Sequence, residues 1–576
     1  MGKNARIVEC VPNFSEGRDA AVIRQITDAV ESVEGVALLN VDPGEATNRT
    51  VVTFVGEPEV VVEAAFRAVR TAGQVIDMRR HHGAHPRIGA TDVLPLVPVS
   101  GITLNECAAL ARRLAERIAA ELAIPCYCYE AAALRPERKN LAVCRKGEYE
   151  GIADRITNEE EKPDFGARPY DEGVARTGCT VVGARDFLIA VNFNLNTTST
   201  RRANAVAFDV REKGRPKRTG NPITGPICRD ADGKAIMIPG TLRCTKAIGW
   251  YIEEYGIAQV SMNMTDLGVT PLHVAFDEVC RAADRRGLRV TGTEIVGLVP
   301  ESTLVEAGKY FLRKQRRSTG LPKDDIIDVA VRSMGLSDLR PFVVEEKVIE
   351  RLMRNRAPKA AQSLVALTAE AFAQETSRES PAPGGGSVAA YIGALAASLG
   401  AMTANLASHK AGWDDRWDEF SAIAERGIAL QEELLRLVDE DTAAFNEIMA
   451  AFALPKTTAE DKLRRRAAVQ AATLHAAQVP LETMQTAAQV IDICREMAQK
   501  GLAATASDAG VGALAARAAV EGAALNVKIN AAALDDKSRA TELVTVANGI
   551  ITEAEKGEKE VMAIVNGKIA ADSSAS

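Results

Sequence analysis

Alanine and proline are distributed unevenly along this chain of 576 residues. Residues 361–576 contain 54 alanines, a quarter of that segment, but only four of the 23 prolines. Alanine is the strongest helix former, whereas proline breaks helix interiors. We therefore expect an all-helical domain at 361–576. The region before it alternates strand and helix patterns, which indicates a different fold.

The first 335 residues repeat one order of elements. Hydrophobic periodicity predicts a first set with strand 6–11, helix 18–31, strands 35–42 and 49–55, helix 58–77 and strand 90–98, followed by helix 103–122 and strand 124–129. It predicts a second set with strand 187–195, helix 199–213, strands 246–253 and 257–264, helix 270–286 and strand 289–297. Both are βαββαβ, the ferredoxin-like order. We expect subdomains at 1–180 and 181–335, joined to the helical domain by a linker at 336–360.

Charge and cysteine content restrict the class of protein. A net charge of −7 gives no reason to expect nucleic acid as a partner. The first residues lack the apolar core of a signal peptide, and the ten cysteines form no Cys-x-x-Cys pair, so we expect reduced thiols in the cytoplasm. Residues 388–408 are uncharged over the length of a membrane span, but their small side chains favour a packed bundle or subunit-interface helix.

Residues 79–93 contain three of the six histidines, His81, His82 and His85, with three arginines and an aspartate. Histidine exchanges protons near neutral pH, and arginine pairs with carboxylates through two hydrogen bonds. A metal site is disfavoured because Gly83 and Pro86 break the helix that a His-x-x-x-His pair needs, and no third ligand lies nearby. Acid/base catalysis, with His85 in an extended conformation before Pro86, competes with a structural or capping role.

A turn at 40–50 carries two further candidates. Asp42 and Arg49 are either parts of a turn by composition alone or functional side chains at strand ends. In the functional interpretation, Asp42 orients an imidazolium and Arg49 holds a substrate carboxylate. On the same chemical grounds, Arg87 is a second candidate for the carboxylates of an anionic substrate. Further along, residues 213–244 are rich in glycine, proline and basic residues, which predicts a long exposed loop.

Asp441 is the informative residue of the helical half. On a helix expected at about 421–453 it lies within an apolar stripe formed by Leu434, Leu437, Val438, Phe445, Ile448, Met449 and Phe452. Burial of a carboxylate is costly and raises its pKa toward that of a general acid. A buried ion pair or a polar interface contact is the structural alternative.

A glycine-rich helix start and two asparagines accompany Asp441. Gly384, Gly385, Gly386 and Ser387 lead into a helix whose free N–H groups could hold an anion or a pterin carbonyl, although a simple capped turn fits equally well. Asn526 and Asn530 share a helical face and either recognise the polar edge of a ring or join two helices.

Two groups of segments resemble a known family. The first resembles glutamate formimidoyltransferase and consists of Ile7-Val8-Glu9-Cys10-Val11-Pro12-Asn13-Phe14-Ser15-Glu16-Gly17, Asp42 with Thr47-Asn48-Arg49-Thr50, and His85-Pro86-Arg87-Ile88-Gly89-Ala90-Thr91-Asp92-Val93. The second resembles formimidoyltetrahydrofolate cyclodeaminase and consists of Pro383-Gly384-Gly385-Gly386-Ser387-Val388-Ala389-Ala390, Val438-Asp439-Glu440-Asp441 and Leu454-Pro455-Lys456. Together they are similar to the bifunctional formimidoyltransferase-cyclodeaminases over nearly the whole chain.

The resemblance implies roles for individual residues. It places the transferase histidine at His85, its acidic partner at Asp42, and the cyclodeaminase aspartate at Asp441. It places folate contacts in two segments, with Gly166, Ala167, Arg168, Pro169, Tyr170, Gly173 and Gly178 in the first and Gly240, Thr241, Leu242, Arg243, Lys246, Ile248 and Gly249 in the second. The long loop at 213–239 departs from the family pattern before the second segment.

The resemblance also implies a reaction sequence. The formimidoyl group moves from N-formimidoyl-L-glutamate to N5 of tetrahydrofolate, and 5-formimidoyltetrahydrofolate then cyclises to 5,10-methenyltetrahydrofolate with loss of ammonia, as part of histidine degradation and one-carbon metabolism. Tetrahydrofolate is a co-substrate, and no metal is expected. The helical domain could instead be a methenyltetrahydrofolate cyclohydrolase or a non-catalytic folate-binding or assembly module. We expect a homo-oligomer with small-molecule partners and without nucleic acid or membrane partners.

Overall fold

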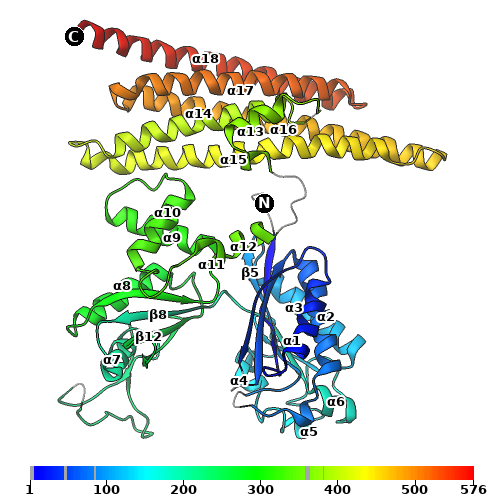
Figure 1. Cartoon of the computed structure of the whole chain (residues 1–576), viewed down its shortest axis with the longest axis vertical. Helices are drawn as coiled ribbons and strands as arrows, with labels where there is room; N and C mark the ends of the chain where they lie inside the picture. The colour runs from blue at the N-terminus through cyan, green and yellow to red at the C-terminus, as the bar shows by residue number, and fades with distance from the viewer. Residues whose placement is uncertain are drawn as a thin grey trace. The chain divides into compact units, whose positions relative to one another are not determined.

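The computed structural model of the chain describes residues 6–44, 48–83, 86–221, 224–356, 363–380 and 382–575. It divides into two compact units. The first consists of residues 1–307 and 334–358, and the second of residues 308–333 and 359–576. The first unit contains the β-sheets and the second is a bundle of long helices (Figure 1).

The N-terminal sheet of the first unit has seven strands. They are β1 (Ile7–Cys10), β2 (Asn13–Phe14), β3 (Ala37–Gly44), β4 (Arg49–Gly56), β5 (Thr91–Ser100), β6 (Cys126–Glu130) and β7 (Thr180–Ala184). The first five pair antiparallel in the spatial order β3-β4-β1/β2-β5, which is the predicted ferredoxin-like core. The parallel strands β7 and β6 extend the sheet beyond β5. The sequence patterns had not indicated β7.

Three amphipathic helices cover one face of this sheet (Figure 1). They are α1 (Ala20–Glu31), α2 (Pro58–Val75) and α3 (Leu104–Leu122). Their apolar sides meet the buried side chains of the strands in one core that includes Phe14, Phe54 and Phe66. This packing fixes the strand ends, from which the site residues project.

The second sheet has four antiparallel strands in the order β11-β12-β8-β13. They are β8 (Ile189–Leu195), β11 (Thr245–Ile252), β12 (Ile257–Met264) and β13 (Val290–Val296), with helices α7 (Thr200–Val210) and α8 (Leu272–Asp284). This is the second predicted βαββαβ unit. Within the segment expected to be a long exposed loop, β9 (Arg215–Pro216) pairs with β10 (Met237–Ile238), and single bridges join Arg218 to Ile227 and Arg229 to Ala235.

The second unit contains five long helices that lie side by side (Figure 1). They are α14 (Gly385–Ser408), α15 (Trp417–Ala453), α16 (Ala459–Lys500), α17 (Ala506–Ala532) and α18 (Lys537–Ala575), preceded by the short helix α13 (Ala369–Thr376). Helix α14 is long and apolar enough to cross a membrane by length and composition alone, and 61% of its most apolar window is buried inside the structure. Its alanines and glycines pack closely against α15 and α17, as its small residues predicted.

Two domain boundaries differ from those expected. Residues 308–333, assigned from sequence to the second subdomain, belong to the helical unit, where Gly320 leaves no room for a Cβ against Ala424 and Asn405 donates to the Gly320 carbonyl at 2.7 Å. Residues 336–356 are not a simple linker, because they include α11 (Val344–Lys347) and α12 (Ile349–Arg356). Ile349 is buried against apolar side chains of β1, β3 and β4, which holds this segment on the first subdomain.

Candidate functional sites

The histidine segment follows the short helix η1 (Met78–Arg80). His81 is buried, accepts from Arg87 Nε through Nδ1 at 3.4 Å, and contacts the Asn48 carbonyl through Nε2 at 2.8 Å. Because Nδ1 is the acceptor, the proton lies on Nε2 and is donated to the carbonyl. Burial lowers the pKa of His81. His81 is therefore a neutral, structural histidine, whereas His82 is exposed and His85 lies outside the described residues.

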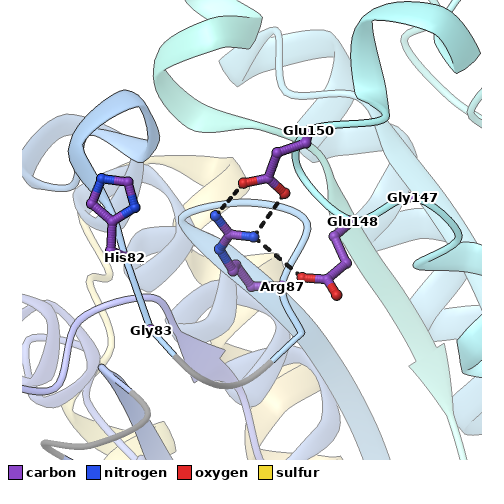
Figure 2. A pocket seen from close by; sticks show the side chains of 6 residues that line it. All are labelled: His82, Gly83, Arg87, Gly147, Glu148 and Glu150. Atoms are coloured by element: carbon purple, nitrogen blue, oxygen red, sulfur yellow. Dashed lines mark hydrogen bonds and ion pairs between the residues drawn. The ribbon is translucent and has the colours of Figure 1, made fainter.

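Arg87 occupies a polar cavity of about 530 Å³, which His82, Gly147 and two glutamates also line. Its guanidinium forms ion pairs with Glu148 at 3.2 Å and Glu150 at 2.6 Å. Figure 2 shows it facing both carboxylates, with the His82 ring standing apart. Arg87, which the sequence suggested for a substrate carboxylate, therefore already pairs with two carboxylates of the protein.

Close backbone contacts fix the chain after His85. Gly89 bridges to Gly178, and a Cβ on either glycine would lie within 2.3 Å of a carbonyl oxygen of the other segment. Gly178 also has φ +66°, which disfavours other residues. Gly178 therefore holds residues 88–89 against residues 178–179 and leads into β7.

A second cavity in this unit, of about 620 Å³, lies between residues of the two sheets. It brings together two candidates predicted separately, Arg49 at the start of β4 and Lys246 on β11. Three cations that the sequence did not single out, Lys139, Arg145 and Arg185, also line it, together with the carboxylates of Glu130, Asp186 and Asp266. A polar cavity with an excess of cationic side chains suits a substrate that carries several carboxylates.

The helical unit assembles its predicted residues into one pocket of about 270 Å³. Its lining includes Gly384, Gly385, Gly386, Asp441, Asn526 and Asn530. Gly384 is the N-cap of α14, and a Cβ on Gly386 would lie 2.1 Å from Asp441 Oδ1. Glycine at this position therefore lets the carboxyl group approach the first turn of α14.

Asp441 has a neutral partner. The buried hydroxyl of Ser387 donates to Asp441 Oδ2 at 2.8 Å and lies 3.2 Å from the Thr442 hydroxyl. Burial raises the pKa of Asp441, although the hydrogen bonds of Ser387 oppose the shift. Within the described part of the chain no cation pairs with it, so one structural alternative, a buried ion pair, is not met. The hydrogen bond to Ser387 on α14 fits the other alternative, a polar contact between helices. A carboxyl group in this setting is suited to donate a proton.

The apolar stripe around Asp441 is buried only in part. Leu434, Leu437 and Val438 are buried, whereas Met449 and Phe452 are about half exposed, at 52% and 49%. The stripe prediction was wrong for these last two residues. The reason is that the first turn of α14 meets α15 at Asp441, so the later turns of α15 extend past the start of α14.

The two asparagines also belong to this pocket. Asn530 donates to the Ala476 carbonyl on α16 at 2.7 Å, and Asn526 donates to Gly522 within its own helix at 3.1 Å. Asn530 thus joins two helices, and both side chains reach the pocket that contains Asp441.

Comparison with known proteins covers both units. Residues 7–185 match the N-terminal subdomain of the formiminotransferase domain, residues 190–354 match the formiminotransferase domain, and residues 368–548 match the family described as formiminotransferase-cyclodeaminase. The formimidoyltransferase-cyclodeaminase of Gallus gallus is 38% identical over 565 residues, which cover 97% of this chain and 99% of that protein. The chain belongs to the formimidoyltransferase-cyclodeaminase family.

Two further relatives match parts of the chain. The glutamate formimidoyltransferase of Streptococcus pyogenes serotype M1 is 40% identical over 309 residues, covering 54% of this chain and 94% of that protein. The methenyltetrahydrofolate cyclohydrolase of Methylorubrum extorquens is 35% identical over 143 residues, covering 25% of this chain and 69% of that protein.

The residues inferred from the family lie at different places in the first unit. Asp42 is exposed on β3 opposite Val51 on β4. In the first folate segment, Arg168 pairs with Asp171, Tyr170 is exposed, and Gly166, at φ +69°, packs on Ala119. Asp42 lies on the edge strand β3, whereas Phe165, beside Gly166, pairs with Cys126 of β6 at the opposite edge of the sheet. None of these positions lines the cavity that contains Arg49.

The second folate segment follows β10 and continues into β11. The N–H groups of Thr241 and Leu242 bond the last carbonyls of α7 at 3.1 and 2.9 Å, and Gly240 has no room for a Cβ beside Arg211. Along β11, Lys246 and Ile248 project from the exposed face, while Gly249 allows Asn204 of α7 to bond its backbone in both directions. Of this segment, Lys246 lines the cavity with Arg49.

The sequence disfavours a metal site at the histidine segment. Among the described residues, which omit His85, no group of three or more His, Cys, Asp or Glu side chains is placed to hold an ion.

Proposed function

We propose that the chain catalyses two successive reactions. The first unit transfers the formimidoyl group of N-formimidoyl-L-glutamate to N5 of tetrahydrofolate. The helical unit then closes N10 onto the same carbon and releases ammonia. Membership of the family, with matches across both units, supports both activities and the roles of folate and of histidine degradation.

The transfer requires two proton movements. N5 attacks the formimidoyl carbon and loses its proton, the bond from this carbon to the glutamate nitrogen breaks, and that nitrogen gains a proton. His85 carries out both transfers in turn, with Asp42 stabilising the protonated ring. This assignment rests on the family resemblance, and the neutral, enclosed environment of His81 supports it by removing one of the other two histidines from the choice.

The cyclisation takes up one proton. N10 attacks the formimidoyl carbon, loses its hydrogen, and the former imino nitrogen leaves as ammonia, which gives the methenyl cation. Asp441 protonates the departing nitrogen, and the glycines of α14 leave space for the folate ring against the carboxyl group. The observation that carries this step is the position of Asp441, in contact with Ser387 and unpaired with any described cation.

The test supplies N-formimidoyl-L-glutamate and tetrahydrofolate together. We expect stoichiometric ammonia and the absorbance of the methenyl product. Appearance of 5-formimidoyltetrahydrofolate without ammonia would limit the activity to the first unit.

A second candidate for the helical unit is methenyltetrahydrofolate cyclohydrolase, because one relative of that name matches a quarter of the chain. The same assay separates the two, since a cyclohydrolase hydrolyses the methenyl compound and releases no ammonia. A non-catalytic folate-binding or assembly module would do neither.

We further propose a cytoplasmic homo-oligomer that needs no metal. Large apolar side chains on α14 and α17 are exposed in the single chain. Leu395 and Leu406 on α14 are 48–50% exposed, and those on α17, which include Leu525 and Ile529, are 46–69% exposed. Such a surface is typical of an interface with a second copy. Light scattering after gel filtration measures the oligomeric state.

A further inference from the structure

Two arginines share one buried carboxylate at the wall of the larger cavity of the first unit. Asp92 on β5 is fully buried. Its Oδ1 accepts from Arg145 Nε at 3.1 Å, its Oδ2 pairs closely with Arg145 Nη2, and Arg49 Nη2 lies 3.7 Å from the same oxygen. The two guanidinium groups are mostly buried, with side chains 17% and 14% exposed. Both line the cavity.

The two guanidinium groups lie on the same buried carboxylate in a poorly solvated place. The described lining of their cavity carries five cationic and three acidic side chains. Burial lowers the pKa of Arg49, the charge of Asp92 opposes this shift, and the charge of Arg145 adds to it. A bound anion would relieve this repulsion, and two guanidinium groups held by a shared carboxylate are fixed in orientation before the anion arrives.

The arginine pair is tied to the histidine segment. Asp92 Oδ1 also accepts the N–H of Ile88 at 3.1 Å, three residues after His85. Asn48, which precedes Arg49, donates to the His82 carbonyl at 3.1 Å and accepts from Gly17. The arginine pair is therefore joined by hydrogen bonds to described residues on both sides of His85 in the sequence.

This position distinguishes the two substrates, both of which carry a glutamate. In N-formimidoyl-L-glutamate the amino acid nitrogen is bonded to the reacting carbon. In tetrahydrofolate the glutamate lies at the far end of the benzoyl group from N5. A carboxylate site next to the acid/base segment therefore fits the donor better than the folate tail.

We propose that Arg49 and Arg145 bind the carboxylates of the formimidoyl donor and that Asp92 is the positioning residue that orients both. The inference rests on the proposed transferase activity. It assigns the second donor arginine to Arg145 in place of Arg87, which Glu148 and Glu150 already engage.

The test is steady-state transfer by the full-length protein carrying Arg145→Lys or Arg145→Ala. Lysine keeps the charge but loses the two-pronged hydrogen bonding. We expect the KM for N-formimidoyl-L-glutamate to rise at least about tenfold in both variants, as for loss of a charge-assisted hydrogen bond, while the KM for tetrahydrofolate and kcat change less than about threefold. Asp92→Asn, which keeps the shape of the side chain, should shift the donor KM in the same direction. Thermal unfolding identifies any variant that has lost its fold.

Lys146→Ala is the matched control, because Lys146 is the adjacent cation and pairs on the surface with Glu161. Its donor KM should match that of the wild type. Glutarate serves as a dicarboxylate probe and butyrate as its monocarboxylate counterpart. Glutarate should compete with the donor in the wild type and about tenfold less strongly in Arg145→Ala, whereas butyrate should inhibit neither.

The outcomes distinguish failure of the proposed transferase function from failure of the arginine assignment. A wild-type protein without transferase activity would remove the proposed function itself. An active enzyme in which folded Arg145→Lys and Arg145→Ala keep the wild-type donor KM would overturn only the arginine assignment. A shift in the KM for tetrahydrofolate that disappears with tetrahydropteroate, which lacks the glutamate, would assign the pair to the folate tail and overturn the donor assignment.

Discussion

Replacement of Asp441 by asparagine separates a catalytic carboxyl group from a structural one. Asparagine keeps the size of the side chain and an oxygen that can accept from Ser387 Oγ, now 2.8 Å from Asp441. Because the partner is neutral, the substitution leaves no buried charge without its counter-ion. The free energy of unfolding should change by no more than about 1 kcal/mol, the value of a typical hydrogen bond. Breaking a buried ion pair would cost about 3–5 kcal/mol.

Catalysis should respond far more strongly than stability. A general acid contributes about 10²–10⁴-fold to the rate. Asp441→Asn should therefore accumulate 5-formimidoyltetrahydrofolate and release ammonia at least about a hundredfold more slowly, with the transferase rate unchanged.

The raised pKa of Asp441 gives both effects a pH dependence. Burial penalises the charged form, so the stability associated with this group is complete below its ordinary pKa of 3.8 and is lost as pH rises through the higher folded value. Asp441→Asn removes this loss, so its stability relative to the wild type should increase from pH 4 to neutral pH. The wild-type ammonia rate should also fall as Asp441 deprotonates with rising pH, and the variant should lack this part of the profile.

The assay measures ammonia from pre-formed 5-formimidoyltetrahydrofolate, with thermal unfolding of the same samples. Glu440→Gln is the matched control, because the neighbouring carboxylate pairs with Arg436 at 3.3 Å outside the pocket. Wild-type ammonia release by folded Asp441→Asn would refute the catalytic role. A large loss of stability with residual activity would point to a structural one.

Four further predictions concern other parts of the chain. His85→Ala should slow transfer at least about 10²-fold while the cyclisation of supplied 5-formimidoyltetrahydrofolate continues; wild-type transfer would move the role to His82. Exhaustive chelation should change neither activity, and restoration of a lost activity by zinc would contradict this. Gly386→Ala should abolish ammonia release and leave transfer unchanged, since its Cβ would lie 2.1 Å from Asp441 Oδ1. Full ammonia release would show that the first turn of α14 can shift away from Asp441, which contradicts this prediction. Burial raises the pKa of Glu9 from 4.5 to about 7, so the stability present below pH 4.5 is lost as pH rises through 7, and Glu9→Gln, followed by urea unfolding at pH 5 and 8, should gain on the wild type at the higher pH.

Much of the fold could be predicted because its signals are local. The bounds predicted for the two βαββαβ sets agree with the observed elements within a few residues, because each strand or helix has its own hydrophobic period in the sequence. The sequence patterns did not predict strand β7, which pairs in parallel with β5 and β6. Residues 308–333 follow the second subdomain in sequence but pack with the helical unit, because their partners, such as Ala424 and Asn405, lie in the helical half of the chain.

Some residues of the candidate sites could be identified from the sequence, and others could not. The position of Asp441 in a helical period and the glycines at 384–386 were visible in the sequence, and the fold brings them into one pocket. Arg145 carried no signal, because nothing in its neighbourhood distinguishes it from a surface cation. Its position beside Arg49 depends on Asp92, 53 residues away in the sequence.

The sequence by itself determined the classes of element, their order, and which residue types could carry acid/base chemistry, because these follow from propensity and periodicity along a few turns of chain. Only the tertiary structure decided how those residues are paired. In the structure His81 is neutral and buried, and Arg87 pairs with two glutamates. Asp441 contacts a serine and no described cation, and Arg49 and Arg145 both contact the buried Asp92. The physical reason is that charge and proton affinity depend on burial and on the nearest opposite charge, and folding supplies both from distant parts of the chain.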